Sequence, residues 1–381
     1  MKIVLIGPTY PFRGGIAHYT TLLCKALRKE HEVKFISFKR QYPKLLFPGK
    51  SDRDPSKNPL KIEGVDYLID SINPLTWITA AQAIRDFIPE KIIIPWWVSF
   101  WIPQFWSILT IIKRKLKAEI VIICHNVIEH ESNFLKKWAT KAILSKADRL
   151  ITHSRAEAFK LKELLGNDIN VISGFLPTYK DVTGKRYSKE SARKKLRISG
   201  NILLFFGLIR EYKGLSVLLD ALPMVVREKE VILLVVGEFW GDKQKYFEQI
   251  HRNQIFNNVR IVDKYVPNEE IGLYFSAADI VVQPYLSATG SAVCQLAYGF
   301  DRPVIATNVG SLQEVIQDGI NGRIVEPNNS QALAKAILES LEPHSLIVLS
   351  DNAAETKEKF SWENMAVIVT GMLSEGKQGT T

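Results

Sequence analysis

The chain has 381 residues, of which 46% are apolar and 24% charged. This length exceeds the size at which one hydrophobic core keeps growing, so we expect two globular domains and exclude a disordered or fibrous protein. The net charge of +10 is uneven, because residues 1–180 hold 28 lysines and arginines against 16 aspartates and glutamates. An anionic partner and a merely soluble basic surface explain this asymmetry equally well.

The N-terminus and the cysteines favour a cytoplasmic protein. The apolar stretch of MKIVLIGPTYPF is too short for a signal peptide and predicts a first strand. Cys24, Cys124 and Cys294 lack CxxC or metal-type spacing, which fits a reducing compartment.

Apolar runs of strand length alternate with stretches of helical period in both halves of the chain. Continuous runs of Ile, Val and Leu indicate strands buried on both faces, so we predict two doubly wound parallel sheets covered by helices. The expected strands of the first half are KIVLIG, VKFIS, VDYLI, KIIIPWW, EIVIICHN, RLITHS and NVISGF. Those of the second half are ILLFFG, VILLVVG, VRIVDK, DIVVQPY, PVIATN and GRIVE.

The polar segment 176–190 lacks periodicity and predicts the boundary between a domain of residues 1–180 and one of residues 190–357. Ligands of open parallel sheets bind beyond the carboxyl ends of the strands. We therefore expect the chemistry in the loops that follow strands, on both sides of an interdomain cleft.

The loop after the first strand carries Gly14 and Gly15 directly before an apolar helix. Paired glycines let backbone amides approach a phosphate or sugar, although a plain tight turn is the alternative. The spacing differs from GxGxxG, which argues against a dinucleotide site.

The equivalent loop of the second half, Gly207–Gly214, carries Arg210 and Lys213. Two cations after a buried strand are suited to bind a diphosphate, whose charge grows as a leaving group departs. After the strand DIVVQPY, the hydroxyl residues Ser287, Thr289 and Ser291 surround Gly290 at a predicted helix start, where they bind a phosphate or serve as plain N-caps.

His125 ends a predicted buried strand, where it hydrogen-bonds a sugar hydroxyl or transfers a proton unless it is structural. His130 follows five residues later, and His18 and His153 are weaker candidates. The tripeptide Asp52-Arg53-Asp54 lies in a polar loop without a strand, so we expect no metal site there.

Residues 92–112 are rich in aromatic side chains and lead into the basic cluster 113–117. Prolines interrupt the stretch, so we do not expect a membrane-spanning helix. A membrane-surface contact and packing in the core are equally consistent with it. The basic residues form no motif that reads nucleic acids, so no nucleic-acid partner is expected.

The blocks ICHNV, FFGLIREYKGL, YVPNEEIGLYFSAADIVVQPY and PVIATNVGSLQEVIQDGINGRIVEP, together with the Gly14-Gly15-Ile16 loop, resemble the GT-B glycosyltransferases of family 4. The resemblance implies two Rossmann-like domains, an N-terminal one for the acceptor and a C-terminal one for the donor. It also implies that a final helix, about residues 358–381, returns to the first domain. Family members are typically metal-independent, retain the anomeric configuration and use nucleotide-diphosphate sugars, and many build lipopolysaccharide or capsule at the inner membrane face.

The resemblance implies roles for individual residues. Lys213 matches the phosphate-binding lysine, and Arg210 is the expected substitute for an arginine that is Leu208 here. The family's paired glutamates fall on Ala288 and Leu296, which leaves Glu314 as the remaining acidic candidate. The catalytic set is expected to be His125, Arg210 and Lys213. The donor set is expected to be Gly14, Gly15, Tyr265, Ser287, Thr289, Gly290, Ser291 and Glu314. The acceptor set is expected to be His18, Trp96, Trp97 and His130.

The leading hypothesis is a retaining sugar transfer from a nucleotide-diphosphate sugar to a lipid-linked or cell-surface glycan, by a peripheral protein on an anionic membrane and without metal or other cofactor. Ala288 and Leu296 motivate the alternative, a catalytically silent sugar- or lipid-binding partner of another glycosyltransferase. A sugar-nucleotide epimerase of the same fold is a third hypothesis.

Overall fold

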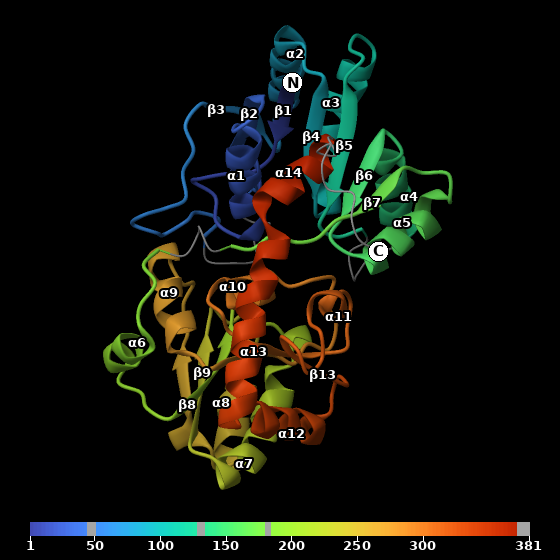
Figure 1. The fold of residues 1–381 in the computed structure, drawn as a ribbon. Coiled ribbons are helices and arrows are strands. Elements are labelled where there is room, and N and C mark those ends of the chain that lie inside the picture. The colour runs from blue at the N-terminus through green and yellow to red at the C-terminus, as the bar shows by residue number, and fades with distance from the viewer. Residues whose placement is uncertain (44–50, 128–133, 180–183, 372–381) are drawn as a thin grey trace. The chain divides into compact units, whose positions relative to one another are not determined.

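The computed structural model describes residues 1–43, 51–127, 134–179 and 184–371, which form two compact units (Figure 1). The first unit comprises Met1–Pro55, Leu60–Phe175 and Ser361–Thr381, and the second comprises Ser56–Pro59 and Leu176–Phe360. The chain thus leaves the first unit after Phe175 and returns to it at Ser361.

Ser56–Pro59 were expected in the first domain but pack with the second unit. The reason lies in two hydrogen bonds at the start of a helix. The Asn268 amide donates to Ser56 Oγ at 2.9 Å, and the Lys57 amide donates to Glu269 Oε1 at 2.9 Å.

The described residues of the first unit form a seven-stranded parallel sheet in the order β3-β2-β1-β4-β5-β6-β7. Its strands are β1 (Lys2–Ile6), β2 (Glu32–Arg40), β3 (Val65–Asp70), β4 (Lys91–Trp96), β5 (Glu119–Cys124), β6 (Arg149–Thr152) and β7 (Val171–Ser173). Its helices are α1 (Gly15–Leu27), α2 (Pro74–Phe87), α3 (Ile102–Lys113), α4 (Phe134–Leu144), α5 (Arg155–Leu165) and α14 (Trp362–Thr370). Helix α14 packs on α1, and the Lys29 ammonium pairs with the Glu363 carboxylate at 2.6 Å.

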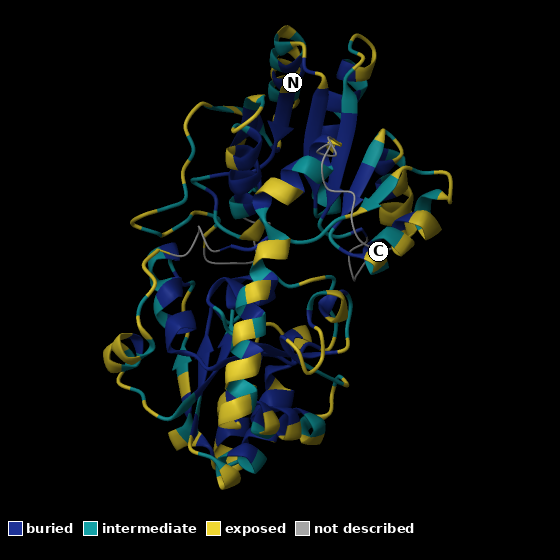
Figure 2. Cartoon of the chain, viewed as in Figure 1, coloured by how far each residue is buried: buried dark blue, intermediate teal, exposed yellow. Residues whose placement is uncertain are grey.

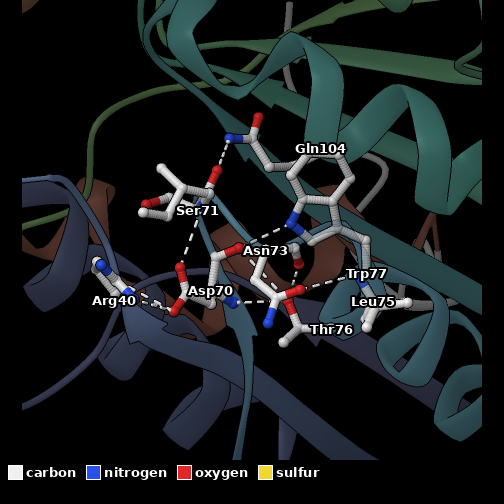
Figure 3. Close-up of polar contacts among 9 residues, drawn as sticks. Arg40, Asp70, Ser71, Asn73, Leu75, Thr76, Trp77 and Gln104 are labelled. Carbon is white, nitrogen blue, oxygen red and sulfur yellow. Dashed lines mark hydrogen bonds and ion pairs between the residues drawn. The ribbon is translucent and has the colours of Figure 1, made fainter.

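Polar groups fix the turn from β3 into α2 (Figure 3). Asn73 caps α2 by accepting from the Leu75 amide at 3.1 Å, and Pro74 occupies the first helical position, where no amide is needed. Trp77 Nε1 donates to the Asp70 carbonyl at 2.8 Å, and Arg40 pairs with the Asp70 carboxylate at 2.6 Å. These bonds connect the carboxyl ends of β2 and β3 to α2.

The described residues of the second unit form a six-stranded parallel sheet in the order β10-β9-β8-β11-β12-β13. Its strands are β8 (Asn201–Phe206), β9 (Val231–Val236), β10 (Val259–Val262), β11 (Ile280–Gln283), β12 (Val304–Thr307) and β13 (Gly322–Val325). Its helices are α6 (Lys189–Leu196), α7 (Leu215–Glu228), α8 (Gln244–Arg252), α9 (Asn268–Ala277), α10 (Ala292–Gly299), α11 (Leu312–Val315), α12 (Ser330–Ser340) and α13 (Pro343–Thr356). The predicted pair of doubly wound parallel sheets is confirmed.

The inner strands of both sheets are buried, whereas exposed residues lie along the helices (Figure 2). Trp96, Trp101 and Phe105 of the aromatic stretch lie in the core of the first unit, each at most 2% exposed. Of the two alternatives for this stretch, packing in the core is therefore correct for these three side chains and contact with a membrane is wrong. The reason is that β4 is an inner strand and α3 covers the sheet. Among the described residues, no helix is both long and apolar enough to cross a membrane.

Gly214, which precedes α7, is expected to be indispensable for the fold. Its φ is +68°, and a Cβ there would lie 1.9 Å from the Pro284 carbonyl oxygen. Gly214→Ala should lower the free energy of unfolding by about 3 kcal/mol or more, measured by urea denaturation.

Gly319→Ala is the matched control, because φ is +74° and the nearest atom is a flexible Arg323 nitrogen at 3.7 Å. This substitution should lower the free energy of unfolding by only about 1 kcal/mol. Equal losses in the two variants would contradict the proposed backbone clash.

Candidate functional site

In the first unit, the loop between β1 and α1 leaves the start of the helix open. Gly14 is the N-cap residue of α1, with φ +107° and no side-chain cap. A Cβ added to Gly14 or Gly15 would meet no atom within 4 Å. Backbone amides of the first turn are therefore accessible to a ligand oxygen.

His125 follows the last residue of β5 and lies in a buried aromatic cluster. Its Nδ1 is 3.2 Å from Nε2 of His153, and its ring meets the Tyr19 ring edge-to-face with centroids 4.4 Å apart. Burial, followed by the neighbouring His153, lowers the pKa of His125 well below its ordinary value. The ring is therefore neutral at physiological pH. Its Nε2 is buried and has no hydrogen-bond partner among the described residues.

His153 is the residue of this cluster that the sequence analysis left outside the site. Its Nδ1 lies 2.9 Å from the Phe175 carbonyl oxygen, and burial lowers its pKa to about 4. The strand register provides the signal that could have identified it. Cys124 pairs with Thr152, so the residues that follow them, His125 and His153, emerge side by side.

The other predicted residues of the first unit are less closely grouped. Burial lowers the pKa of His18 to about 4, against an opposing effect of Asp54. Trp97 is half-buried and donates from Nε1 to the Tyr42 hydroxyl at 2.9 Å. Trp96 is 2% exposed in the core, so its prediction as an acceptor contact is wrong. His130 lies outside the described residues.

In the second unit, Lys213 is buried beside Gly207, the glycine that directly follows β8. Only 8% of the residue is exposed, and its Nζ lies 3.0 Å from where a Cβ of Gly207 would be. The ammonium is also 5.6 Å from the centre of the Tyr285 ring. Burial, reinforced by Arg210, lowers the pKa of Lys213 to about 8.

Arg210 lies in the same loop, three residues before Lys213, and is exposed. Its guanidinium carbon is 4.5 Å from the centre of the Trp240 ring, a cation–π arrangement that holds the side chain while its donors stay accessible. Neither Arg210 nor Lys213 forms an ion pair with a carboxylate among the described residues. Two close cations without acidic partners favour binding of an anion.

The loop after β11, the neighbour of β8, holds the predicted hydroxyl residues. Ser311 Oγ donates to the Thr289 carbonyl at 2.7 Å and lies 3.2 Å from where a Cβ of Gly290 would be. Ser291 precedes α10 without a side-chain cap. The contact with Ser311 joins this loop to the start of α11, which carries the exposed Glu314.

Of the two remaining predicted donor contacts, Ser287 is half-buried in the loop after β11. Tyr265 follows β10, the edge strand, and β9 separates that strand from β8. Tyr285 and Trp240, which contact the two cations, were missed because neither forms a motif in the sequence. Among the described residues, no group of three or more acidic, histidine or cysteine side chains is arranged to hold a metal ion.

Comparisons with known proteins match both units. Residues 13–178 match the family described as "Glycosyltransferase Family 4", and residues 200–343 match "Glycosyl transferases group 1". A D-inositol 3-phosphate glycosyltransferase of Corynebacterium urealyticum is 27% identical over 62% of this chain and 59% of its own length. The match thus spans less than two thirds of that relative.

Solved structures show the fold. HepE of Anabaena in complex with UDP has a TM-score of 0.72 and 18% identity, covering 98% of this chain and 100% of that one. The apo form of WaaB, a lipopolysaccharide outer core galactosyltransferase, has a TM-score of 0.69 and 14% identity, covering 98% and 100%. Both are similar to this chain in having two parallel-sheet domains.

The buried Lys213 ammonium is expected to lower stability. Because its pKa falls to about 8 in the folded state, from 10.5, the unfolded chain binds more protons between these values, and stability rises with pH across that window. Lys213→Met should therefore raise the free energy of unfolding at pH 7 by about 1–3 kcal/mol.

Urea denaturation of both proteins at pH 7 and pH 10 measures this effect. The advantage of the Met variant should shrink at pH 10, where the folded wild type is largely neutral at this position. A Met variant that is less stable than the wild type at pH 7 would refute the assignment.

Proposed function

Because the chain belongs to the GT-B glycosyltransferases of family 4, we propose that it transfers a sugar from a nucleoside-diphosphate sugar to a glycan or lipid-linked acceptor. In this proposal the first unit binds the acceptor and the second binds the donor. The observation that carries it is the pair of cations, Arg210 and Lys213, without acidic partners among the described residues.

Departure of the nucleoside diphosphate places growing negative charge on its terminal phosphate. The buried Lys213 ammonium and the accessible Arg210 guanidinium are suited to stabilise that charge, more strongly because Lys213 is shielded from water. We propose that these two groups replace a metal ion, and that no cofactor is required. The bound UDP of HepE supports a nucleoside diphosphate as the ligand class.

Recognition of the sugar is the second part of the proposal. Since Ala288 and Leu296 stand where carboxylates were expected, we propose that the hydroxyls of Ser287, Thr289 and Ser291, the amides near Gly290 and the carboxylate of Glu314 bind the donor. Gly14, Gly15 and Tyr265 are further proposed donor contacts, and His125 is the proposed contact of the transferred sugar. We propose that the transfer retains the anomeric configuration of that sugar. His18 and Trp97 are the proposed acceptor contacts that remain.

We further propose that the protein works at the cytoplasmic face of an anionic membrane, through a surface that is centred on α4 and includes only part of the predicted stretch. Helix α4 exposes Phe134, Leu135 and Trp138, at 81%, 71% and 66%. We call these three residues the α4 face. The exposed side chains Lys136, Lys137 and Lys141 lie on the same helix. An interfacial contact with anionic lipid needs apolar side chains that enter the membrane surface and basic side chains that attract the lipid headgroups, and this helix exposes both.

The neighbouring helix α3 extends this surface. Trp106 is 41% exposed, and the Lys146 ammonium lies 3.9 Å from the centre of its ring. The basic cluster that ends α3, residues 113–117, is largely exposed. WaaB is a lipopolysaccharide outer core galactosyltransferase, which supports the proposal of an acceptor at a membrane.

Ala288 and Leu296 also support the alternative of a catalytically silent partner. Calorimetry with UDP, GDP, ADP, CMP and dTDP separates the two functions. An enzyme must bind one of these nucleotides, whereas a silent partner need bind none.

Lys213→Ala should lower the rate of sugar transfer by about 10²-fold or more, because an electrostatic contact to the leaving group is lost. Turnover of the nucleotide sugar that binds in calorimetry measures this, in buffer with EDTA to test metal independence. Lys335→Ala, at an exposed lysine of α12, should transfer at the wild-type rate. Wild-type turnover of the Lys213 variant would contradict the proposed role.

The double substitution Phe134→Ser, Trp138→Ser should abolish binding to phosphatidylglycerol vesicles, because both aromatic anchors of the α4 face are removed. Vesicle flotation measures the bound fraction, with phosphatidylcholine vesicles to show the dependence on lipid charge. Phe256→Ser, at a 57% exposed aromatic of the second unit, is the control and should bind like the wild type. Undiminished flotation of the double variant would disprove this surface.

A further inference from the structure

We propose that His153 is a positioning residue that fixes the tautomer of His125, so that Nε2 of His125 is a hydrogen-bond acceptor reserved for a ligand hydroxyl. This inference rests on the proposed function only for the identity of the ligand, a sugar. The tautomer itself follows from contacts within the first unit.

The first step is the bond between His153 and the backbone. A carbonyl oxygen has no hydrogen and can only accept, so at 2.9 Å the Phe175 carbonyl must receive a hydrogen from Nδ1 of His153. A neutral imidazole carries one N–H, which this bond uses. Since burial lowers the pKa of His153 to about 4, its ring is neutral at pH 7 and its Nε2 bears a lone pair.

The second step shows how the tautomer of His153 determines the tautomer of His125. Two ring nitrogens 3.2 Å apart can hydrogen-bond only if one of them carries the hydrogen. Because Nε2 of His153 has none, Nδ1 of His125 must be the donor. His125 is also neutral, so its Nε2 has no hydrogen and accepts.

The third step concerns what Nε2 of His125 can bind. This atom is buried without a partner among the described residues, and a buried acceptor that stays unpaired costs free energy. A sugar hydroxyl can donate to it. A fully ionised phosphate oxygen cannot, because it carries no hydrogen. The tautomer therefore selects a hydroxyl and disfavours a phosphate at this position.

The surroundings hold both rings in place. Cys124 of β5 pairs with Thr152 of β6, so the two histidines that follow these residues lie side by side. The Tyr19 ring contacts both, with centroids 4.4 Å from His125 and 5.2 Å from His153. Trp362 of α14 packs on the Tyr19 ring at 5.1 Å.

The test is an NMR measurement of the ring nitrogens on the whole protein, labelled with ¹⁵N-histidine and without substrate at pH 7. Long-range ¹H–¹⁵N correlations show which nitrogen carries hydrogen, and the His125→Asn spectrum assigns the His125 signals. We expect Nδ1–H with a bare Nε2 in the wild type. Wild-type signals of an Nε2–H tautomer or of a charged ring would overturn the proposal.

His153→Phe retains the ring packing and removes both nitrogens, whereas His153→Gln places an acceptor oxygen near the position of Nε2. We expect the Nε2–H form of His125 to appear in the Phe variant and the Nδ1–H form to return in the Gln variant. His344→Gln, at an exposed histidine of α13, should leave the His125 signals unchanged. A Phe variant that is folded by circular dichroism but keeps the pure Nδ1–H form would also overturn the proposal.

A kinetic measurement extends the test to the ligand. kcat/KM should fall about tenfold to a hundredfold in the Phe variant and recover in part in the Gln variant. Because the NMR measurement needs no substrate, a protein without transferase activity would refute the proposed function while leaving the tautomer assignment intact. An unchanged kcat/KM in the Phe variant, despite a changed tautomer, would refute the link to the substrate.

Discussion

Parallel strands that are buried on both faces confine polar side chains to the ends of the sheet. Their central residues are Ile, Val and Leu that contact helices above and below, so a charged or hydrogen-bonding group has no place there. Only where a strand ends can a side chain reach a ligand. His125 and His153 follow β5 and β6, and the loop with Arg210 and Lys213 follows β8. Both candidate sites therefore depend on the strand order and register of their own sheets.

Both sites contain polar groups in surroundings that oppose ionisation, with different consequences. Burial leaves the histidine pair uncharged, so these rings act through the direction of their hydrogen bonds. Lys213 keeps its charge near neutrality despite burial, and so acts through its electric field. Neither arrangement contributes to stability in the way an apolar side chain would. Ionisable groups whose pKa is shifted by burial are frequent at functional sites.

The sequence predicted the two sheets well, because continuous apolar runs separated by helical stretches are a strong and local signal. It also located the Arg210 and Lys213 loop, since the loop directly follows a recognisable strand. The positions of the aromatic side chains were harder to predict. The strand KIIIPWW was predicted, but the pattern did not show that the Trp96 side chain lies in the core, whereas the exposed Trp138 lies on a short helix with no distinctive motif. His153 was only a weaker candidate because its contact with His125 joins residues 28 positions apart, which no local pattern shows. Ser56–Pro59 depend on hydrogen bonds to a helix more than 200 residues away.

The return of the chain to the first unit has a consequence for biosynthesis. Trp362 packs on Tyr19, which contacts both histidines, so the environment of His125 includes a residue that follows the second unit along the chain. A ribosome releases the whole second unit before Trp362 emerges. The second unit can therefore fold while the first still lacks one of its helices, and the aromatic cluster is completed only after the whole second unit has been synthesised. A nascent chain that is interrupted before Trp362 would carry the loop with Arg210 and Lys213 but not the complete surroundings of the histidine pair.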